Sequence, residues 1–268
     1  MKPTGGILPH LLLAIFSLYI LLPPLWVLRT SFVSDASAYK LALLPDVTLA
    51  NFVKLFTKDA FALAYRDSFA AAAGSTLLGL PIAAMTGYAF ARYRTGGRAS
   101  RFFILATQML PPVALVLPTF GLFRVMGLTN SVTGLVIAYG AINLPFLTWI
   151  MMGFFEGVPV ELEWAAMTDG ATVWSAFWRI VLPISLPGLA AAGVLGFILA
   201  WNEFLFALIL TGPTTATIPV ALAGLQSQNG VEIAEISAGV VLAVAPLLIS
   251  SRFIRNNLVR GLTLGAIK

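Results

Sequence analysis

The sequence lacks cysteine, has a single histidine (His10) and carries few charges. Without cysteine there is no disulfide or thiol chemistry, and metal-ligand spacings such as H-E-x-x-H are absent. Only 10% of the 268 residues are charged, whereas a soluble domain has about a quarter. So few charges cannot cover a water-exposed surface of this size. The net charge of +5 comes from basic residues at the ends of apolar runs, which indicates membrane topology rather than nucleic-acid binding.

Long runs without charge take the place of a polar surface. A helix needs about 20 apolar residues to cross a bilayer core, and the alternating polarity of transmembrane strands is not seen. The sequence therefore predicts an all-α, polytopic membrane protein with six transmembrane helices. The predicted spans are residues 7–28, 67–91, 102–123, 131–154, 184–208 and 236–252. The polar stretch 29–66 is predicted to form short surface helices.

The first apolar run has a second interpretation. Lys2, the apolar stretch and Ala36-Ser37-Ala38 together resemble a secretory signal with a small-x-small cleavage site. The apolar part of such a signal is about 7–15 residues long, whereas residues 7–28 are more numerous and contain Pro23-Pro24. A retained first span is therefore favoured.

Orientation follows from the arginines. Arg92, Arg94, Arg98 and Arg101 make residues 92–101 the most basic loop of the chain, and such loops remain in the cytoplasm. Six spans then place both termini and the insert 156–179 in the cytoplasm. The loop 211–235, which has no Lys or Arg, is predicted to lie outside.

The insert 156–179 begins with a predicted short helix. Pro159 suits a first helical position, and Glu161 and Glu163 suit the positive end of the helix dipole. Three residues spaced at i, i+3 and i+4 form one apolar strip: Leu162, Ala165 and Ala166.

Gly170 is predicted to end that helix in the left-handed conformation. Thr172 can then cap a second short helix bearing Trp174, Phe177 and Trp178. The result is a helix–Gly–helix elbow whose small side chains would let the groove of another protein close over it. The alternative is an amphipathic helix that lies on the lipid surface with aromatic anchors.

Several motifs here resemble those of a known family. Ala165-Ala166, Gly170 and Ile180-Val181-Leu182-Pro183 resemble the EAA-loop signature of type-1 ABC importer permeases. The motif usually has Glu directly before the two alanines, where this chain has Trp164, with Glu163 one residue earlier. Other segments resemble the carbohydrate-uptake branch, in the manner of the smaller maltose-type permease subunit: Asp67-Ser68-Phe69, Gly87-Tyr88-Ala89-Phe90-Ala91-Arg92, Met109-Leu110-Pro111-Pro112, Gly127-Leu128-Thr129-Asn130, Asn143-Leu144-Pro145, Trp201-Asn202-Glu203-Phe204 and Gly261-Leu262-Thr263.

This resemblance implies a type-1 ABC importer fold in a bacterial inner membrane, with a first helix and outer loop at 1–62, a transmembrane domain at 63–255 and a tail at 256–268. It implies four kinds of partner: a second permease subunit, two ATPase subunits that bind the ATP, an extracytoplasmic substrate-binding protein and membrane lipid. It implies a carbohydrate-like substrate, no cofactor on this chain and no nucleic acid. The elbow would dock in the ATPase cleft through seven coupling residues: Leu162, Glu163, Trp164, Ala165, Ala166, Asp169 and Gly170.

Three other functions remain open at this stage. A membrane enzyme would need facing nucleophiles, acid–base pairs or metal ligands, and we identify no catalytic residue. A stand-alone channel or secondary carrier would not need the elbow. A permease for a non-carbohydrate solute has the same composition. No P-loop pattern occurs, so ATP hydrolysis is expected on a separate chain.

Polar residues within the spans are candidates for the solute pathway, because ionisable groups there usually face the bundle or an aqueous cavity. Asn143 lies in the fourth predicted span. Asn202 and Glu203, late in the fifth, are predicted to line the outer part of the pathway, with Trp201 offering a flat face to a sugar. Alternatively, Glu203 hydrogen-bonds to another span or reaches the membrane interface.

Overall fold

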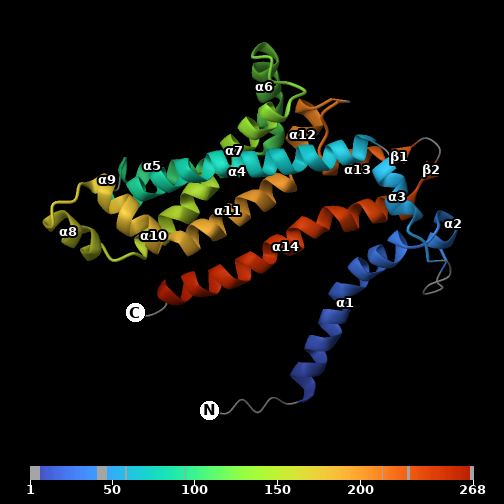
Figure 1. The fold of residues 1–268 in the computed structure, drawn as a ribbon, viewed down its shortest axis with the longest axis horizontal. Coiled ribbons are helices and arrows are strands. Elements are labelled where there is room, and N and C mark those ends of the chain that lie inside the picture. Colours follow the sequence, from blue (N-terminus) through green and yellow to red (C-terminus); the bar gives the residue numbers. More distant parts are fainter. Residues whose placement is uncertain are drawn as a thin grey trace. The chain divides into compact units, whose positions relative to one another are not determined.

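The computed structural model describes residues 7–40, 47–57, 59–93, 95–212, 214–227 and 230–265, most of them in helices (Figure 1). The elements that precede the predicted elbow are α1 (Ile7–Ser31), α2 (Asp35–Ala38), α3 (Ala50–Thr57), α4 (Asp59–Tyr93), α5 (Gly97–Gln108), α6 (Pro112–Val125) and α7 (Val132–Glu156). Those that form and follow it are α8 (Glu161–Thr168), α9 (Val173–Ala176), the π-helix η1 (Phe177–Val181), α10 (Leu182–Ile184), α11 (Leu186–Trp201), α12 (Leu205–Leu210), α13 (Ile218–Gly224), the short antiparallel strands β1 (Gln226–Ser227) and β2 (Gly230–Val231), and α14 (Ile233–Gly265).

The helical class and the number of predicted spans agree with the structure. Among the described residues, four helical segments are long and apolar enough to cross a membrane: α1, α7, Ala60–Tyr93 of α4 and Ile233–Ser250 of α14. Two bent pairs of helices bring the number to six if each pair is one span. Ala99–Gln108 and α6 meet at 89°, and Val173–Ile184 and α11 meet at 74°.

Two predicted spans are interrupted: the third, where the proline pair predicts a kink, and the fifth, where hydropathy predicted a continuous helix. The span 102–123 is broken between α5 and α6, where Pro111 and Pro112 lack donors and disfavour helical backbone before them. The span 184–208 is broken between α11 and α12, at residues 202–204. Both ends of α4 and α14 also extend beyond the predicted apolar parts, because polar residues continue a helix outside the apolar core.

The chain divides into two compact units, residues 1–62 with 221–245 and residues 63–220 with 246–268. In the first unit, α3 is tied to the beginning of α14 by Lys54, whose ammonium group pairs with Glu232 and, at 2.8 Å, with the buried Glu235. These hydrogen bonds raise the pKa of Lys54. The carboxamide of Asn51 donates to two backbone carbonyls at the end of α1 and just after it. The short helices predicted within 29–66 are thus present and anchored.

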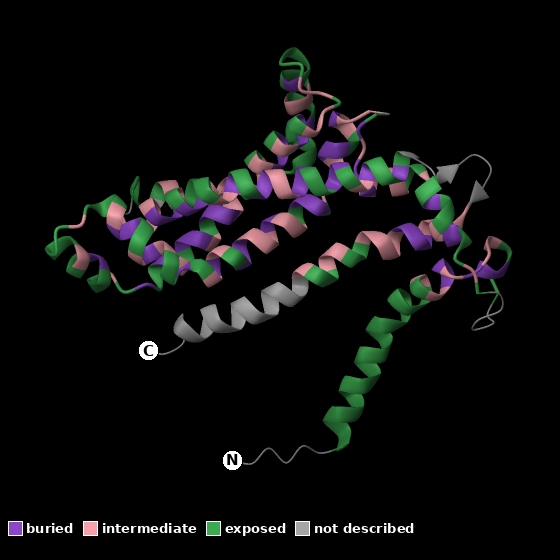
Figure 2. Cartoon of the chain, viewed as in Figure 1, coloured by how far each residue is buried: buried purple, intermediate pink, exposed green. Residues whose placement is uncertain are grey.

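In the second unit, buried residues lie along α4, α7 and α11 (Figure 2). One apolar cluster joins the last turns of α4 to the end of α7 and to η1: Ala83, Ala84, Tyr88, Leu147, Met151, Phe155, Phe177, Val181 and Ala192. Gly87 lets α4 approach α7 closely, since a Cβ there would lie 2.9 Å from the backbone nitrogen of Met152. This packed end of the unit carries the elbow.

Candidate functional site: the α8–α9 elbow

The elbow, residues 161–176, is formed by local signals that the sequence displays. Gly170 has φ +89°, and its N–H donates to the carbonyl of Met167 at 3.1 Å. The hydroxyl of Thr172 then accepts the N–H of Ser175 at 3.2 Å and caps α9. The predicted glycine break and threonine cap are both confirmed. Helix α8 itself begins at Glu161, two residues after Pro159.

Every residue of α8 except Glu163 and Ala166 is exposed. Leu162 is 42% exposed and Trp164 is 57% exposed. Ala165 is also exposed, and Ala166 is half-buried. Asp169 and Gly170, where the helix ends, are exposed as well. Six of the seven predicted coupling residues can therefore touch another molecule.

Glu163 is the seventh, and the structure places it inside the protein, where it is 4% exposed. Its Oε1 accepts a hydrogen bond from Nε of Arg92 at 2.5 Å, and its Oε2 accepts one from the hydroxyl of Tyr88 at 2.6 Å. Nη2 of Arg92 also donates to the carbonyl of Val158 at 2.7 Å, in the linker before α8. We call these contacts the Glu163 network. Neither Tyr88 nor Arg92 was singled out as a partner of Glu163 from the sequence, since 71 and more residues separate them.

The Tyr88 ring is held by aromatic neighbours from other elements. Its centroid lies 4.7 Å from that of Phe177 in η1 and 5.8 Å from that of Phe155 in α7. Tyr93, at the end of α4, packs edge-on at 6.1 Å. The phenol that bonds Glu163 is thus fixed in position by packing, independently of the hydrogen bond.

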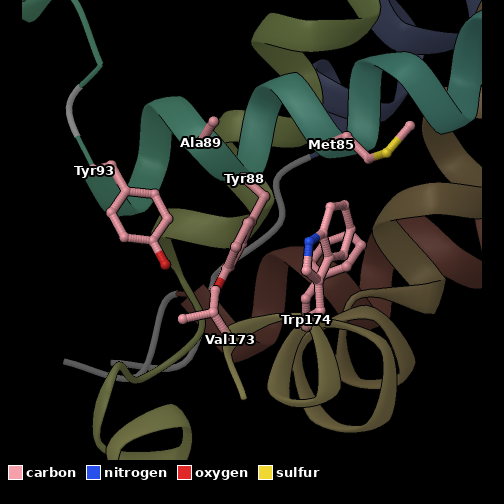
Figure 3. Close-up of a pocket in the computed structure, with 7 residues that line it drawn as sticks. Met85, Tyr88, Ala89, Tyr93, Val173 and Trp174 are labelled. Atoms are coloured by element: carbon pink, nitrogen blue, oxygen red, sulfur yellow. The ribbon is translucent and has the colours of Figure 1, made fainter.

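A cavity of about 350 Å³ lies between the last turns of α4 and α9 (Figure 3). Its lining is apolar and consists of Met85, Tyr88, Ala89, Tyr93, Val173, Trp174 and Phe177. Trp174 is 60% exposed at its edge.

A second ion pair lies at the same end of this unit. Nη1 of Arg101 is 2.9 Å from Oε1 of Glu156, and its Nη2 donates to the carbonyl of Phe90 at 2.7 Å. The pair joins α5 to the ends of α4 and α7. Arg92 and Arg101, two arginines of the loop that suggested the orientation, thus also connect the helix ends.

The pathway candidates from the fifth predicted span lie at the break between α11 and α12. Trp201 is 2% exposed, its ring stacks on Phe197 at 5.7 Å, and Tyr65 packs on it edge-on at 5.5 Å. The expectation that Trp201 offers a free face to a sugar does not hold in this structure, because both neighbours already cover the indole.

Glu203 and Asn202 have local partners. The carboxylate of Glu203 accepts the N–H groups of Phe206 at 3.0 Å and Ala207 at 3.1 Å, and so caps α12. Asn202 is exposed, and its Nδ2 donates to the carbonyl of Ile198 at 2.8 Å. Asn143 lies in α7 and is half-buried. These two hydrogen bonds join Glu203 to the following helix, α12.

A larger cavity, of about 480 Å³, lies beside the proline break of α5 and α6. It is lined by Thr107, Gln108, Leu110, Pro112, Leu115, Thr119, Leu122, Phe123, Ile137, Ala138, Ala141, Ile142, Pro145 and Phe206. Sequence reasoning did not select Thr107, Gln108 or Thr119. The signal that could have found them is Pro111-Pro112, because a broken helix within a membrane needs a polar or water-filled neighbourhood.

The chain is similar to several known proteins over most of its length. The sulfoquinovosyl glycerol transport system permease protein SmoH of Agrobacterium fabrum is 35% identical over 253 residues, which are 92% of this chain and 89% of that protein. The trehalose transport system permease protein SugB of Mycobacterium tuberculosis is 35% identical over 257 residues, 93% of each chain. A chain in the crystal structure of a bacterial ABC transporter involved in alginate import has the same fold, with a TM-score of 0.80, 23% identity and coverage of 94% of this chain and 95% of that one. The family described as binding-protein-dependent transport system inner membrane component matches residues 75–264, and this chain is a member of it.

Proposed function

We propose that this chain is the transmembrane permease subunit of an ABC importer for a sugar, polyol or related carbohydrate, and that its elbow docks on a separate ATPase. The observation that carries the docking proposal is the accessible face of α8, with Leu162 and Ala165 exposed while Glu163 points inward. The relatives named for trehalose and for sulfoquinovosyl glycerol support a carbohydrate as the transported solute.

The proposed assembly contains a second permease subunit, two ATPase subunits and an extracytoplasmic substrate-binding protein. The family description, which names dependence on a binding protein, supports the last of these. Binding and hydrolysis of ATP belong to the ATPase subunits. This chain contributes half of the pathway and the surface that receives their motion.

The cavity at the α5–α6 break is our candidate for the part of the pathway that contacts solute. Its wall is mostly apolar, with the side chains of Thr107, Gln108 and Thr119 among the lining groups. A few polar groups in an apolar wall suit a hydroxyl-rich solute, which needs hydrogen bonds but must also leave. Asn202 and Asn143, the exposed and half-buried amides, remain secondary candidates.

Substitution of Ala166 tests the docking of α8. In an ATPase cleft, the larger side chain of Ala166→Leu meets a packed wall, and overpacking costs about 1–3 kcal/mol. That corresponds to roughly five- to 150-fold weaker association. We expect normal amounts of the variant in the membrane, but little co-purified ATPase and no uptake.

The matched control is Ala70→Leu, the same change at an exposed position of α4, which should leave uptake intact. A cysteine at Ala165 gives a second readout, because the chain has no other. Normal uptake by Ala166→Leu together with no cross-link from Ala165→Cys to the ATPase, at any stage of the ATP cycle, would refute the docking proposal.

The proposed orientation places both termini, the 92–101 loop and the elbow in the cytoplasm, and the loop 211–235 outside. The arginine distribution supports it. Alkaline phosphatase fused after Gly96 should be inactive, and the same enzyme fused within 211–235 should be active. The reverse pattern would overturn the orientation without affecting the family assignment.

A further inference from the structure

We infer that Glu163, Arg92 and Tyr88 are positioning residues that make α8 and the last turns of α4 move as one body, so that the second span directly receives the displacement of α8. The inference rests on the proposed docking of α8 to an ATPase. It adds the route by which motion at the docking surface reaches the bundle.

The Glu163 network holds both α8 and the linker before it against α4. Each carboxylate oxygen has its own donor on α4, the guanidinium Nε of Arg92 on Oε1 and the phenol of Tyr88 on Oε2. The same guanidinium also holds the carbonyl of Val158 in the linker. The Arg92 side chain of α4 is therefore hydrogen-bonded both to α8 and to the segment that precedes it. Rotation or withdrawal of α8 must either break these bonds or carry the end of α4 along.

The burial of the network indicates why these charges are present. Glu163 is 4% exposed as a residue, and the Arg92 side chain is 11% exposed. A buried ion pair adds little net stability, because the cost of removing both charges from water offsets their attraction. What it does supply is a defined relative position, since removal of one partner leaves an uncompensated charge. The network is therefore better explained as a positional link than as a source of stability.

On α4, the link ends beside a close contact with α7. Tyr88 follows Gly87, whose Cα lies against the α7 backbone so closely that a Cβ would be 2.9 Å from a Met152 atom. The phenol ring is also packed by Phe155 and Phe177. A displacement of Glu163 is thus transmitted to the part of α4 that packs against α7 and η1.

The second helix of the elbow faces α4 through apolar groups, including Phe177 just after α9, whose ring contacts that of Tyr88. Between α9 and α4 lies the cavity of about 350 Å³, with Met85 and Ala89 on the α4 side and Val173 and Trp174 on the α9 side (Figure 3). An unfilled apolar contact can shift without breaking hydrogen bonds. This contrast points to α8, rather than α9, as the helix that drives α4.

The test uses the complete importer in proteoliposomes and measures solute imported per ATP hydrolysed, ATPase co-purification, and the mobility of a spin label on Glu161→Cys, an exposed position of α8 outside the seven coupling residues. Glu163→Ala removes both acceptors, and we expect solute per ATP to fall about tenfold or more, as for loss of a buried pair. ATPase should still co-purify, hydrolysis should continue, and the label should become more mobile. Glu163→Gln should recover most of the coupling, because its amide can accept from Arg92 and donate to the Tyr88 oxygen.

Tyr88→Phe keeps the packed ring and removes only one hydrogen bond, so it tests the same link even if Glu163→Ala does not reach the membrane. We expect roughly a two- to tenfold loss of solute per ATP, from one hydrogen bond. The matched controls are Glu232→Ala, which removes an exposed ion-pair acid in the other unit, and Tyr19→Phe, at an exposed site in α1. Both should keep the wild-type ratio.

Two results would overturn the inference. One is a wild-type ratio in both Glu163→Ala and Tyr88→Phe. The other is loss of bound ATPase in proportion to lost uptake with unchanged label mobility, which would make Glu163 part of the docking surface. Failure of the proposed function itself is recognised separately, because the wild-type chain would then neither retain an ATPase nor support ATP-dependent uptake.

Discussion

Gly87 is the position where one added methyl group should most clearly disturb the packing beneath the elbow. A Cβ at Gly87 would lie 2.9 Å from the backbone nitrogen of Met152, 3.0 Å from the Cβ of Met151 and 3.1 Å from the carbonyl oxygen of Thr148. Two of these are backbone atoms of α7, which cannot rotate away. Gly87→Ala therefore forces α4 and α7 apart and weakens the dispersion contacts along their seam.

Gly79 provides the matched control on the same helix. A Cβ there meets only a side-chain methyl of Leu147 at 3.7 Å, an ordinary contact. In both variants alanine improves helix propensity by about 1 kcal/mol, so this gain cancels in the comparison. The remaining difference is the overpacking at Gly87, about 1–3 kcal/mol. Gly87→Ala should be less stable than Gly79→Ala by that amount.

The measurement is reversible unfolding of the purified chain in mixed micelles, followed by loss of helix signal with increasing denaturant. We expect Gly79→Ala to match or exceed the wild type and Gly87→Ala to unfold at a lower denaturant concentration. Equal midpoints for the two variants would refute the close approach of α4 to α7 on which this reasoning depends. A lower midpoint for Gly79→Ala alone would refute it more strongly.

Three further predictions concern single side chains. Gly170→Val should reduce uptake and cost about 1–2 kcal/mol of unfolding free energy, because φ +89° disfavours a side chain although the surrounding space is open. Gly170→Asn should retain more uptake, because asparagine tolerates this backbone better than valine does. Equal loss of uptake in the two variants would contradict the backbone argument. Glu203→Ala should lower unfolding free energy by about 0.5–2 kcal/mol through loss of the α12 cap, measured by the same unfolding assay, and an unchanged value would show that the cap is dispensable. Lys54→Met should destabilise the chain, because the raised pKa of Lys54 means that the folded state favours its charged form. The stability from this ion pair is fully present below the unfolded pKa of about 10.4 and is lost only as pH rises through the higher folded pKa. The difference in unfolding free energy between Lys54→Met and the wild type should therefore be constant between pH 6 and 9 and shrink under strongly alkaline conditions. A difference that disappears near neutral pH would contradict this reasoning.

Some features of the site could be predicted because their causes are local. Gly170 and Thr172 act on their own turn, through a backbone conformation that glycine adopts freely and a hydroxyl that reaches an N–H three residues later. The proline pair at 111 and 112 likewise marks a break by its covalent structure. No proline marks residues 202–204, and there hydropathy predicted a continuous helix that the structure divides.

The direction of Glu163 could not be predicted in the same way. In the first turn of α8 an acid is favourable whether it points toward solvent or toward the bundle. Its actual partners, Tyr88 and Arg92, are brought to it by packing of the end of α4 against α7 and η1. The prediction that Trp201 offers a free face to a sugar was wrong for a related reason. Its covering rings are Phe197, one helical turn away, and Tyr65, which only the fold brings near.

The sequence by itself determined which segments cross the membrane, where the elbow turns and which family the chain resembles, because apolar length, glycine and proline act over a few residues. The tertiary structure alone decided which side chains of those segments face one another. In the fold, Glu163 is buried although its neighbours along α8 are exposed, Trp201 is covered by other aromatic rings, and a cavity lies at the α5–α6 break. These outcomes depend on contacts between residues far apart in the chain, where small changes in helix rotation exchange a buried side chain for an exposed one.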